Sequence, residues 1–270
     1  MSFEGKTAWI TGASSGIGAA LAREWGNRGA RVILSGRDEA RLAEVADSIS
    51  TETLILPFDV RDEDAMKDAT DKAIAWHGVD IFVANAGVSQ RSAAVDTDMQ
   101  VYRDIIDIDL TAQIAATQAL LPHVTERGSG HLLFISSIAG KVGVPMRTAY
   151  CAAKFGLAGY ADALRAELSQ SDVQVHVIYP GSVATDVSRN ALTSDGSKRG
   201  RSDSVIDNGI PPGEAAKWIV DAVAKGEREV IVAQGMEQAM GEARRTPEQL
   251  LDQVAAMVAS GYMEKMKAEG

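Results

Sequence analysis

The amino-acid sequence predicts an α/β fold, a doubly wound parallel sheet of seven strands with helices on both faces. Three observations lead to this prediction. Short β-branched segments alternate with longer amphipathic segments along most of the chain. The strand segments are almost continuously apolar, as expected when helices cover both faces of a parallel sheet. A glycine-rich turn joins the first strand to the first helix, as in dinucleotide-binding folds.

Each element is predicted from its own pattern, and the regular alternation implies right-handed crossovers and a Rossmann-type sheet. The predicted strands are 7–11, 31–35, 53–58, 79–85, 131–137, 173–180 and 229–233. The predicted helices are 16–28, 38–50, 61–76, 98–127, 148–170 and 213–225. Because no internal boundary is rich in Pro, Gly or Ser and no repeat occurs, we expect one domain over residues 1–270.

Two segments depart from this alternation. Residues 186–212 are polar and rich in glycine, and they lie where a substrate loop would cover the carboxyl side of the sheet. A disordered surface loop is the alternative. The tail, 236–270, is predicted to be helical, with Thr246-Pro247-Glu248 as a helix start that has a cap and a proline in the first turn. Its packing stripe would consist of Leu250, Leu251, Val254 and Met257.

Composition excludes several classes of function. The net charge of −10 repels a phosphate backbone, so nucleic-acid binding is not expected. No apolar run approaches the roughly 20 residues that span a bilayer, and the amino terminus leads directly into a strand, so we expect a cytoplasmic protein without membrane contact. The single Cys151 suits a reducing compartment and is interpreted as a small buried helix residue. The four histidines lack ligand spacing, which argues against a metal site.

The turn after the first strand reads TGASSGIG, residues 11–18. Glycines there permit a tight turn, close approach to a pyrophosphate and close packing of the helix on the strand. The helix amino terminus would hold the anionic phosphates. A Gly-Lys-Ser/Thr pattern is absent, so a nucleotide triphosphatase is disfavoured. The residues expected to bind the cofactor here are Gly12, Ser14, Ser15, Gly16, Ile17 and Gly18.

Tyr150 and Lys154 are four residues apart in the predicted helix 148–170, so both side chains leave the same face. A free phenol ionises only near pH 10, and an ammonium held beside it favours the phenolate. Such a pair suits proton transfer in carbonyl or alcohol chemistry. Taken alone, this spacing is also that of an ordinary solvated helix face.

These motifs occur in an order that resembles the short-chain dehydrogenase/reductase family over about residues 5–235. The glycines follow the spacing GxxxGxG, and Ser137 precedes Tyr150 by 13 residues. The motifs that carry the resemblance are TGASSGIG at 11–18, Asp59-Val60, Asn85-Ala86-Gly87, Ser136-Ser137, Tyr150 with Lys154, and Pro180-Gly181 with Thr185.

The resemblance implies hydride transfer between a nicotinamide cofactor and a small carbonyl or secondary alcohol substrate. Tyr150 would be the general acid in reduction and the base in oxidation, Ser137 would bond the substrate oxygen, and Lys154 would also bond the nicotinamide ribose. By the same resemblance, Asp59 and Val60 would contact adenine, although Asp59 and Asn85 also suit ordinary strand-end turns. The remaining residues implied at the cofactor are Asn85, Ala86 and Gly87 beneath it, and Pro180, Gly181, Val183 and Thr185 at the nicotinamide end.

One catalytic position departs from the family pattern. The family asparagine whose main-chain carbonyl holds a water near the lysine corresponds to Asp109 in this sequence. An aspartate can keep the local hydrogen bonds. Its charge near Lys154 would oppose the phenolate, so we expect alcohol oxidation to need higher pH.

The cofactor preference is predicted from the end of the second strand. NAD-preferring members carry an acidic residue there, whereas this chain has Gly36 followed by Arg37, which could pair with a 2′-phosphate. Asp38 is interpreted as the N-cap of the next helix. Ser15 stands where many NADP-preferring members have a second basic residue, which weakens the prediction. NADP is favoured, and NAD remains possible.

The leading prediction is therefore an NADP(H)-dependent carbonyl reductase or alcohol dehydrogenase. The alternatives are an NAD-dependent alcohol dehydrogenase and a catalytically inactive nucleotide-binding regulatory protein, the latter suggested by Asp109. By the family resemblance, the protein would form a homodimer or homotetramer through helices 98–127 and 148–170.

Overall fold

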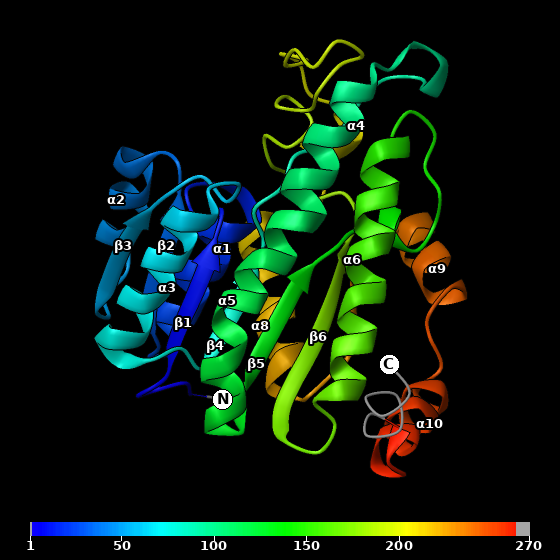
Figure 1. Ribbon diagram of the computed structural model, residues 1–270. Helices are drawn as coiled ribbons and strands as arrows, with labels where there is room; N and C mark the ends of the chain where they lie inside the picture. Colours follow the sequence, from blue (N-terminus) through cyan, green and yellow to red (C-terminus); the bar gives the residue numbers. More distant parts are fainter. Residues whose placement is uncertain (1, 263–270) are drawn as a thin grey trace.

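The computed structural model describes residues 2–262, apart from the side chain of Val254. Its centre is one parallel sheet with the strand order β3-β2-β1-β4-β5-β6-β7, so the predicted doubly wound, Rossmann-type fold is confirmed (Figure 1). The strands are β1 Thr7–Thr11, β2 Arg31–Gly36, β3 Thr53–Pro57, β4 Ile81–Ala84, β5 Ser129–Ile135, β6 Asp172–Pro180 and β7 Glu229–Val232.

Helices cover both faces of the sheet (Figure 1). Helices α1, α2 and α8 contribute to one apolar core, and α3, α5 and α6 contribute to the other. Successive side chains of β1 point to opposite faces of the sheet, so Ile10 packs in the first core and Trp9 in the second. This two-sided burial explains why the strands are continuously apolar. The helices are α1 Gly16–Asn27, α2 Glu39–Asp47, α3 Glu63–His77, α4 Met99–Ile106, α5 Ala112–Arg127, α6 Thr148–Glu167, α7 Ser204–Asp207, α8 Pro212–Ala224, α9 Gly235–Ala243 and α10 Glu248–Ala259.

The segment predicted as one helix, 98–127, is interrupted. A π-helical turn, Asp107–Thr111, separates α4 from α5. π-helical turns inside α-helices contain an inserted residue and occur frequently at functional sites. Here the turn carries the fully buried Asp109.

Residues 186–212 form a hydrogen-bonded excursion rather than a disordered loop. The Leu192 amide donates to the Ser89 carbonyl (2.8 Å), and the Leu192 carbonyl accepts from the Arg91 amide (2.9 Å). Near its base, Ile210 pairs with Val183 in an isolated β-bridge. The excursion therefore has a backbone frame that joins it to the segment after β4.

The tail contains α9 and α10, and α10 lies against the carboxyl-terminal end of α6 (Figure 1). The predicted start of α10 is corrected in one respect: the N-cap residue is Pro247, and no side chain in the described part of the chain caps the helix there. The amide of Thr246, one residue earlier, donates a hydrogen bond to Glu229 Oε2 (2.9 Å). In the predicted stripe, Leu251 is buried while Leu250 and Met257 are about half exposed. The Val254 side chain lies outside the described part.

Over residues 2–262, no helix is both long enough and apolar enough to cross a membrane. Cys151 is buried on α6, and its Sγ accepts a hydrogen bond from the Val144 amide (3.3 Å). This agrees with its interpretation as a buried helix residue.

Candidate active site

A cavity of about 1010 Å³ opens at the carboxyl ends of the central strands. β1 lies between β2 and β4, so the winding of the chain reverses beside β1, which is where ligands bind in open α/β sheets. Every predicted catalytic or cofactor-binding residue lines this one cavity. They are Gly12, Ser14, Ser15, Gly16, Ile17, Gly18, Arg37, Asp59, Val60, Asn85, Ala86, Gly87, Asp109, Ser137, Tyr150, Lys154, Pro180, Gly181, Val183 and Thr185.

The glycine turn forms a narrow cradle at the start of α1. Gly12 has a φ of +66°, and a Cβ on it would lie 2.8 Å from the Ala86 Cα. A Cβ on Gly18 would collide with the Gly12 carbonyl oxygen. No side chain among the described residues caps the amino terminus of α1, so its first amides remain available to an anion. The cradle thus fits a pyrophosphate.

Asn85 joins the end of β4 to this turn. Its Nδ2 donates to the Thr11 carbonyl (2.8 Å), and its amide donates to Thr11 Oγ1 (3.0 Å). Thr11 Oγ1 in turn donates to the Val83 carbonyl (3.2 Å). Asn85 therefore helps to set the floor of the cavity, which is consistent with its predicted place beneath a cofactor.

Tyr150 and Lys154 lie on the same side of α6, and Lys154 Nζ is 5.6 Å from the centre of the Tyr150 ring. Ser137 follows β5 on the same cavity wall. Its Oγ donates to the Pro180 carbonyl (3.3 Å) and accepts from the Ala139 amide (3.1 Å). The phenol, the ammonium and the hydroxyl thus border one space, as the sequence predicts.

The Lys154 ammonium group is buried and contacts two acceptors. Its Nζ donates to the Ile135 carbonyl (3.0 Å) and forms an ion pair with Asp109 Oδ2 (3.1 Å). The Lys154 and Asp109 side chains are 4% and 0% exposed. Asp109 Oδ1 also accepts from the Val88 amide (2.7 Å). At the position of the family asparagine, this chain therefore has a carboxylate in direct contact with the lysine.

Burial and pairing act against each other in this ion pair. Burial disfavours the Lys154 ammonium, but the nearby Asp109 carboxylate outweighs it and raises the pKa of Lys154 above its ordinary value. Burial also raises the pKa of the Asp109 carboxyl, even though Lys154 and the Val88 amide favour its charged form. The carboxylate of Asp109 thus stabilises the ammonium form of Lys154 against the effect of burial.

The end of the cavity beyond β2 and β3 carries arginines. Both carboxylate oxygens of Asp59 accept hydrogen bonds from the Arg61 guanidinium (3.1 and 2.7 Å). These hydrogen bonds lower the pKa of Asp59 despite its partial burial. Arg37 is exposed and lies 4.0 Å from Asp59. Asp38 accepts from the Arg41 amide (3.1 Å), which confirms it as the N-cap of α2.

Sequence reasoning missed several residues that line the cavity. Arg41 and Arg61 line the same cavity as Arg37. Arg61, two residues after Asp59, could have been noticed as a second cation near the predicted adenine contact. The substrate loop was predicted as a segment, without its individual wall residues. Those wall residues are Asp186, Val187, Asn190, Leu192, Gly196, Lys198 and Ile206.

A family model described as short chain dehydrogenase matches residues 6–195. The chain belongs to the short-chain dehydrogenase/reductase family. This short-chain dehydrogenase/reductase is 39% identical to dehydrogenase/reductase SDR family member 7B of Danio rerio over 238 residues. The aligned region covers 84% of this chain and 77% of the relative. The family and the fold together make it an NAD(P)-dependent oxidoreductase.

Solved structures agree with the short-chain dehydrogenase/reductase fold. A metagenomic short-chain oxidoreductase in complex with NADP is 31% identical, with a TM-score of 0.72 over 87% of this chain and 100% of that chain. A short-chain dehydrogenase/reductase from Burkholderia phymatum in complex with NAD has a TM-score of 0.80 over 92% of this chain and 98% of that chain. At 19% identity, the second likeness concerns the fold alone.

Proposed function

We propose that this short-chain dehydrogenase/reductase interconverts a small carbonyl compound and its secondary alcohol with NADP(H), and that Tyr150 moves the proton. The observation that carries the proposal is the convergence of Ser137, Tyr150 and Lys154 on the cavity that also contains the glycine cradle. When bound, the nicotinamide gives or takes the hydride. The chain's own residues hold the reacting oxygen and move its proton.

In the reducing direction, the Tyr150 hydroxyl would donate its proton to the substrate oxygen as negative charge develops there. Ser137 would turn its hydroxyl from the Pro180 carbonyl to the same oxygen, which adds a second donor. Lys154 has two partners, the Ile135 carbonyl and Asp109. Since an ammonium has three N–H donors, the third would serve a ribose hydroxyl and keep positive charge beside the phenol.

The test compares wild type with Tyr150→Phe and Tyr160→Phe, using NADPH and a panel of ketones and aldehydes. Tyr160 is a matched control because it lies on the same helix and packs edge-on against Phe134. Tyr150→Phe should lower kcat by at least about 10²-fold while leaving NADPH affinity nearly unchanged, because loss of a general acid typically costs 10²–10⁴-fold. Binding of NADPH by wild type without turnover of any substrate would favour an inactive regulatory protein.

The preference for NADP rests on charge at the end of β2. Arg37, Arg41 and Arg61 line the cavity near the end of β2, although Arg61 is paired with Asp59, and the chain has Gly36 where an acidic residue would repel a 2′-phosphate. A Cβ atom at position 36 would meet no close contact, because it would lie 3.6 Å from Ser14 Oγ, an ordinary van der Waals distance. The NADP complex of the metagenomic relative supports the same preference.

Replacing Gly36 by Asp should therefore fit the fold and reverse the preference. We expect Gly36→Asp to raise the KM for NADPH by about 10-fold or more, since an unfavourable 1.4 kcal/mol is a factor of ten, while the KM for NADH stays equal or falls. Arg37→Ala should raise the KM for NADPH alone. Wild-type kcat/KM that is higher with NADH would instead establish the NAD-dependent alternative.

We also infer that the protein forms a homodimer or homotetramer through α4, α5 and α6. Helices α4 and α6 pack side by side, and Phe155 on α6 is 39% exposed. Light scattering of wild type and Phe155→Glu should show a smaller species for the variant. A wild-type monomer would contradict the inference.

A further inference from the structure

The turn after β6 is held from the C-terminal helix α9. The Ser182 amide donates to Glu237 Oε2 (2.7 Å), and the Ser182 hydroxyl donates to Glu237 Oε1 (2.9 Å). A Cβ on Gly181 would collide with Glu237 Oε2. The Glu237 carboxylate is therefore seated directly on the turn that would form the wall at the nicotinamide end.

Helix α9 also lies against the segment that carries Ser137. A Cβ on Gly241 would come within 2.8 Å of Ile138 Cδ1, so only a glycine allows this approach without displacing Ile138. Ile138 follows Ser137 directly in a short 3-10 turn, Ile138–Gly140. One helix thus supports both the Ser137 loop and the turn after β6.

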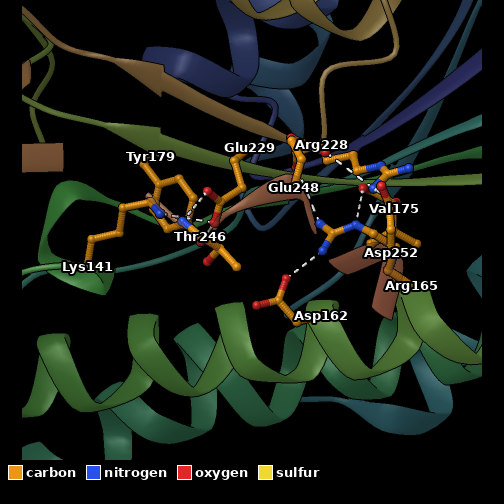
Figure 2. A network of polar contacts seen from close by, with 10 residues as sticks. All are labelled: Lys141, Asp162, Arg165, Val175, Tyr179, Arg228, Glu229, Thr246, Glu248 and Asp252. Atoms are coloured by element: carbon orange, nitrogen blue, oxygen red, sulfur yellow. Dashed lines mark hydrogen bonds and ion pairs between the residues drawn. The ribbon is translucent and has the colours of Figure 1, made fainter. Parts of the chain in front are cut away.

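A polar network that includes the buried pair Lys141 and Glu229 reaches Thr246, three residues beyond the end of α9 (Figure 2). Lys141 Nζ pairs with Glu229 Oε1 (3.0 Å) and donates to the Arg244 carbonyl (3.2 Å), while Glu229 Oε2 accepts from the Thr246 amide (2.9 Å). The Lys141 and Glu229 side chains are 4% and 0% exposed. Since breaking such a pair leaves a buried charge without compensation, these contacts hold residues 244–246 firmly.

The same turn meets the substrate loop. The Ser182 carbonyl accepts from the Ile210 amide (2.9 Å), and the Pro180 carbonyl accepts from Ser137 Oγ (3.3 Å). Ser182 is therefore hydrogen-bonded to α9 through its amide and hydroxyl, and to the base of the loop through its carbonyl. A displacement of this turn would move the nicotinamide wall, the acceptor of the Ser137 hydroxyl and the loop entrance together.

We propose that Glu237 is a positioning residue of the active site: through Ser182 it holds the Pro180–Val183 turn in the place that the cofactor and Ser137 require. The proposal rests on the function proposed above. A carboxylate that accepts two hydrogen bonds from one residue fixes both distance and direction. Misplacement of catalytic groups by about 1 Å can cost on the order of 10²-fold in rate.

The experiment compares Glu237→Ala, Glu237→Gln and Glu242→Ala, the last being an exposed glutamate on the same helix. We expect Glu237→Ala to lower kcat by about 10- to 100-fold and to weaken NADPH binding, measured by calorimetry. Glu237→Gln should recover most of both losses, because its amide oxygen can accept from the Ser182 amide and its NH₂ can donate to the Ser182 hydroxyl. Glu242→Ala should match wild type.

Three results would overturn the proposal: wild-type kcat and NADPH affinity in Glu237→Ala, equal losses in the Gln and Ala variants, or the same losses in Glu242→Ala. Should Glu237→Ala fail to fold, Ser182→Ala removes only the hydroxyl contact and should give a smaller loss of the same kind. Failure of the proposed function is distinguishable, because wild type would then lack turnover while calorimetry would still report any effect of Glu237 on NADPH binding.

Discussion

At the scale of single residues, Lys154 is held between a backbone carbonyl and a carboxylate. Removing one member of a buried ion pair typically costs about 3–5 kcal/mol, because the other charge is left without compensation. The raised pKa of Lys154 follows from the opposing effects of burial and the Asp109 carboxylate. This carboxylate stabilises the ammonium, but it also offsets the positive charge that Tyr150 would experience.

Asp109→Asn should move the pH profile of alcohol oxidation to lower pH. In the proposed mechanism, oxidation needs the phenolate of Tyr150. A carboxylate near Lys154 opposes that negative charge, so its neutral amide analogue should lower the pH at which the rate rises. The asparagine oxygen can still accept from the Val88 amide. The measurement is kcat/KM against pH for both proteins, and coincident profiles would remove this role of Asp109.

The sequence predicted residues that line one cavity, but it did not predict how those residues pair with one another. Glycines, serines and the Tyr–Lys pair follow one another in order, so the predicted residues all line the cavity. The Asp59–Arg61 contact depends instead on how the chain turns after β3. The Lys154–Asp109 ion pair likewise joins positions 45 residues apart, where no local pattern measures distance.

At the scale of elements, the π-helical turn was invisible in the sequence. Residues 98–127 have helical spacing, and one inserted residue changes that spacing too little to be noticed. The backbone of the turn nevertheless decides where Asp109 points. By contrast, the strands and most helices were predicted within a few residues, because burial on two faces leaves a strong apolar pattern.

The excursion of residues 186–212, which is the predicted substrate loop, has its own polar anchor at Asp203. This carboxylate accepts from Arg91 (2.8 Å) and Ser188 (2.9 Å) and pairs with Arg199. Partial burial opposes its charge, but these hydrogen bonds prevail and hold the pKa of Asp203 well below its usual range. Because the folded-state pKa is lowered, the stabilisation is present above the unfolded value near pH 4 and is lost as the pH falls below it.

Asp203→Asn should therefore lower the free energy of unfolding at pH 7 by about 2 kcal/mol, the scale of hydrogen bonds to a charged group. Urea unfolding monitored at pH 7 and pH 3 provides the measurement, and the difference from wild type should shrink at pH 3. The exposed Asp207 lies in the same loop, and Asp207→Asn should change stability by less than about 0.5 kcal/mol. Equal effects at both pH values would contradict the assignment.

At the scale of the whole molecule, a histidine pair between β5 and β6 links stability to pH far from the site. His131 Nδ1 and His176 Nε2 are 3.1 Å apart, and His176 Nδ1 donates to the Glu227 carbonyl (2.7 Å). Burial lowers the pKa of His176 to about 4. An unfolded chain would take up a proton near pH 6.5, so the folded state loses stability as the pH falls from about 6.5 to about 4.

We expect this single group to contribute up to about 3 kcal/mol of that loss. His176→Gln should flatten the plot of unfolding free energy against pH between pH 4 and 6.5, even if its stability at pH 7 is reduced. An unchanged slope in His176→Gln would show that folding does not shift the pKa of His176, and it would contradict the prediction.

Besides the Asp203 anchor, main-chain hydrogen bonds and bridges hold the excursion of residues 186–212, as at Leu192, which pairs with both Gln90 and Lys198. Peptide groups are the same whatever side chain they carry. Side chains that face the cavity, such as Asn190 and Lys198, can therefore be exchanged while the frame persists. If the proposed function holds, substitutions at these positions would change which substrates the cavity accepts, while the residues proposed for catalysis stay in place.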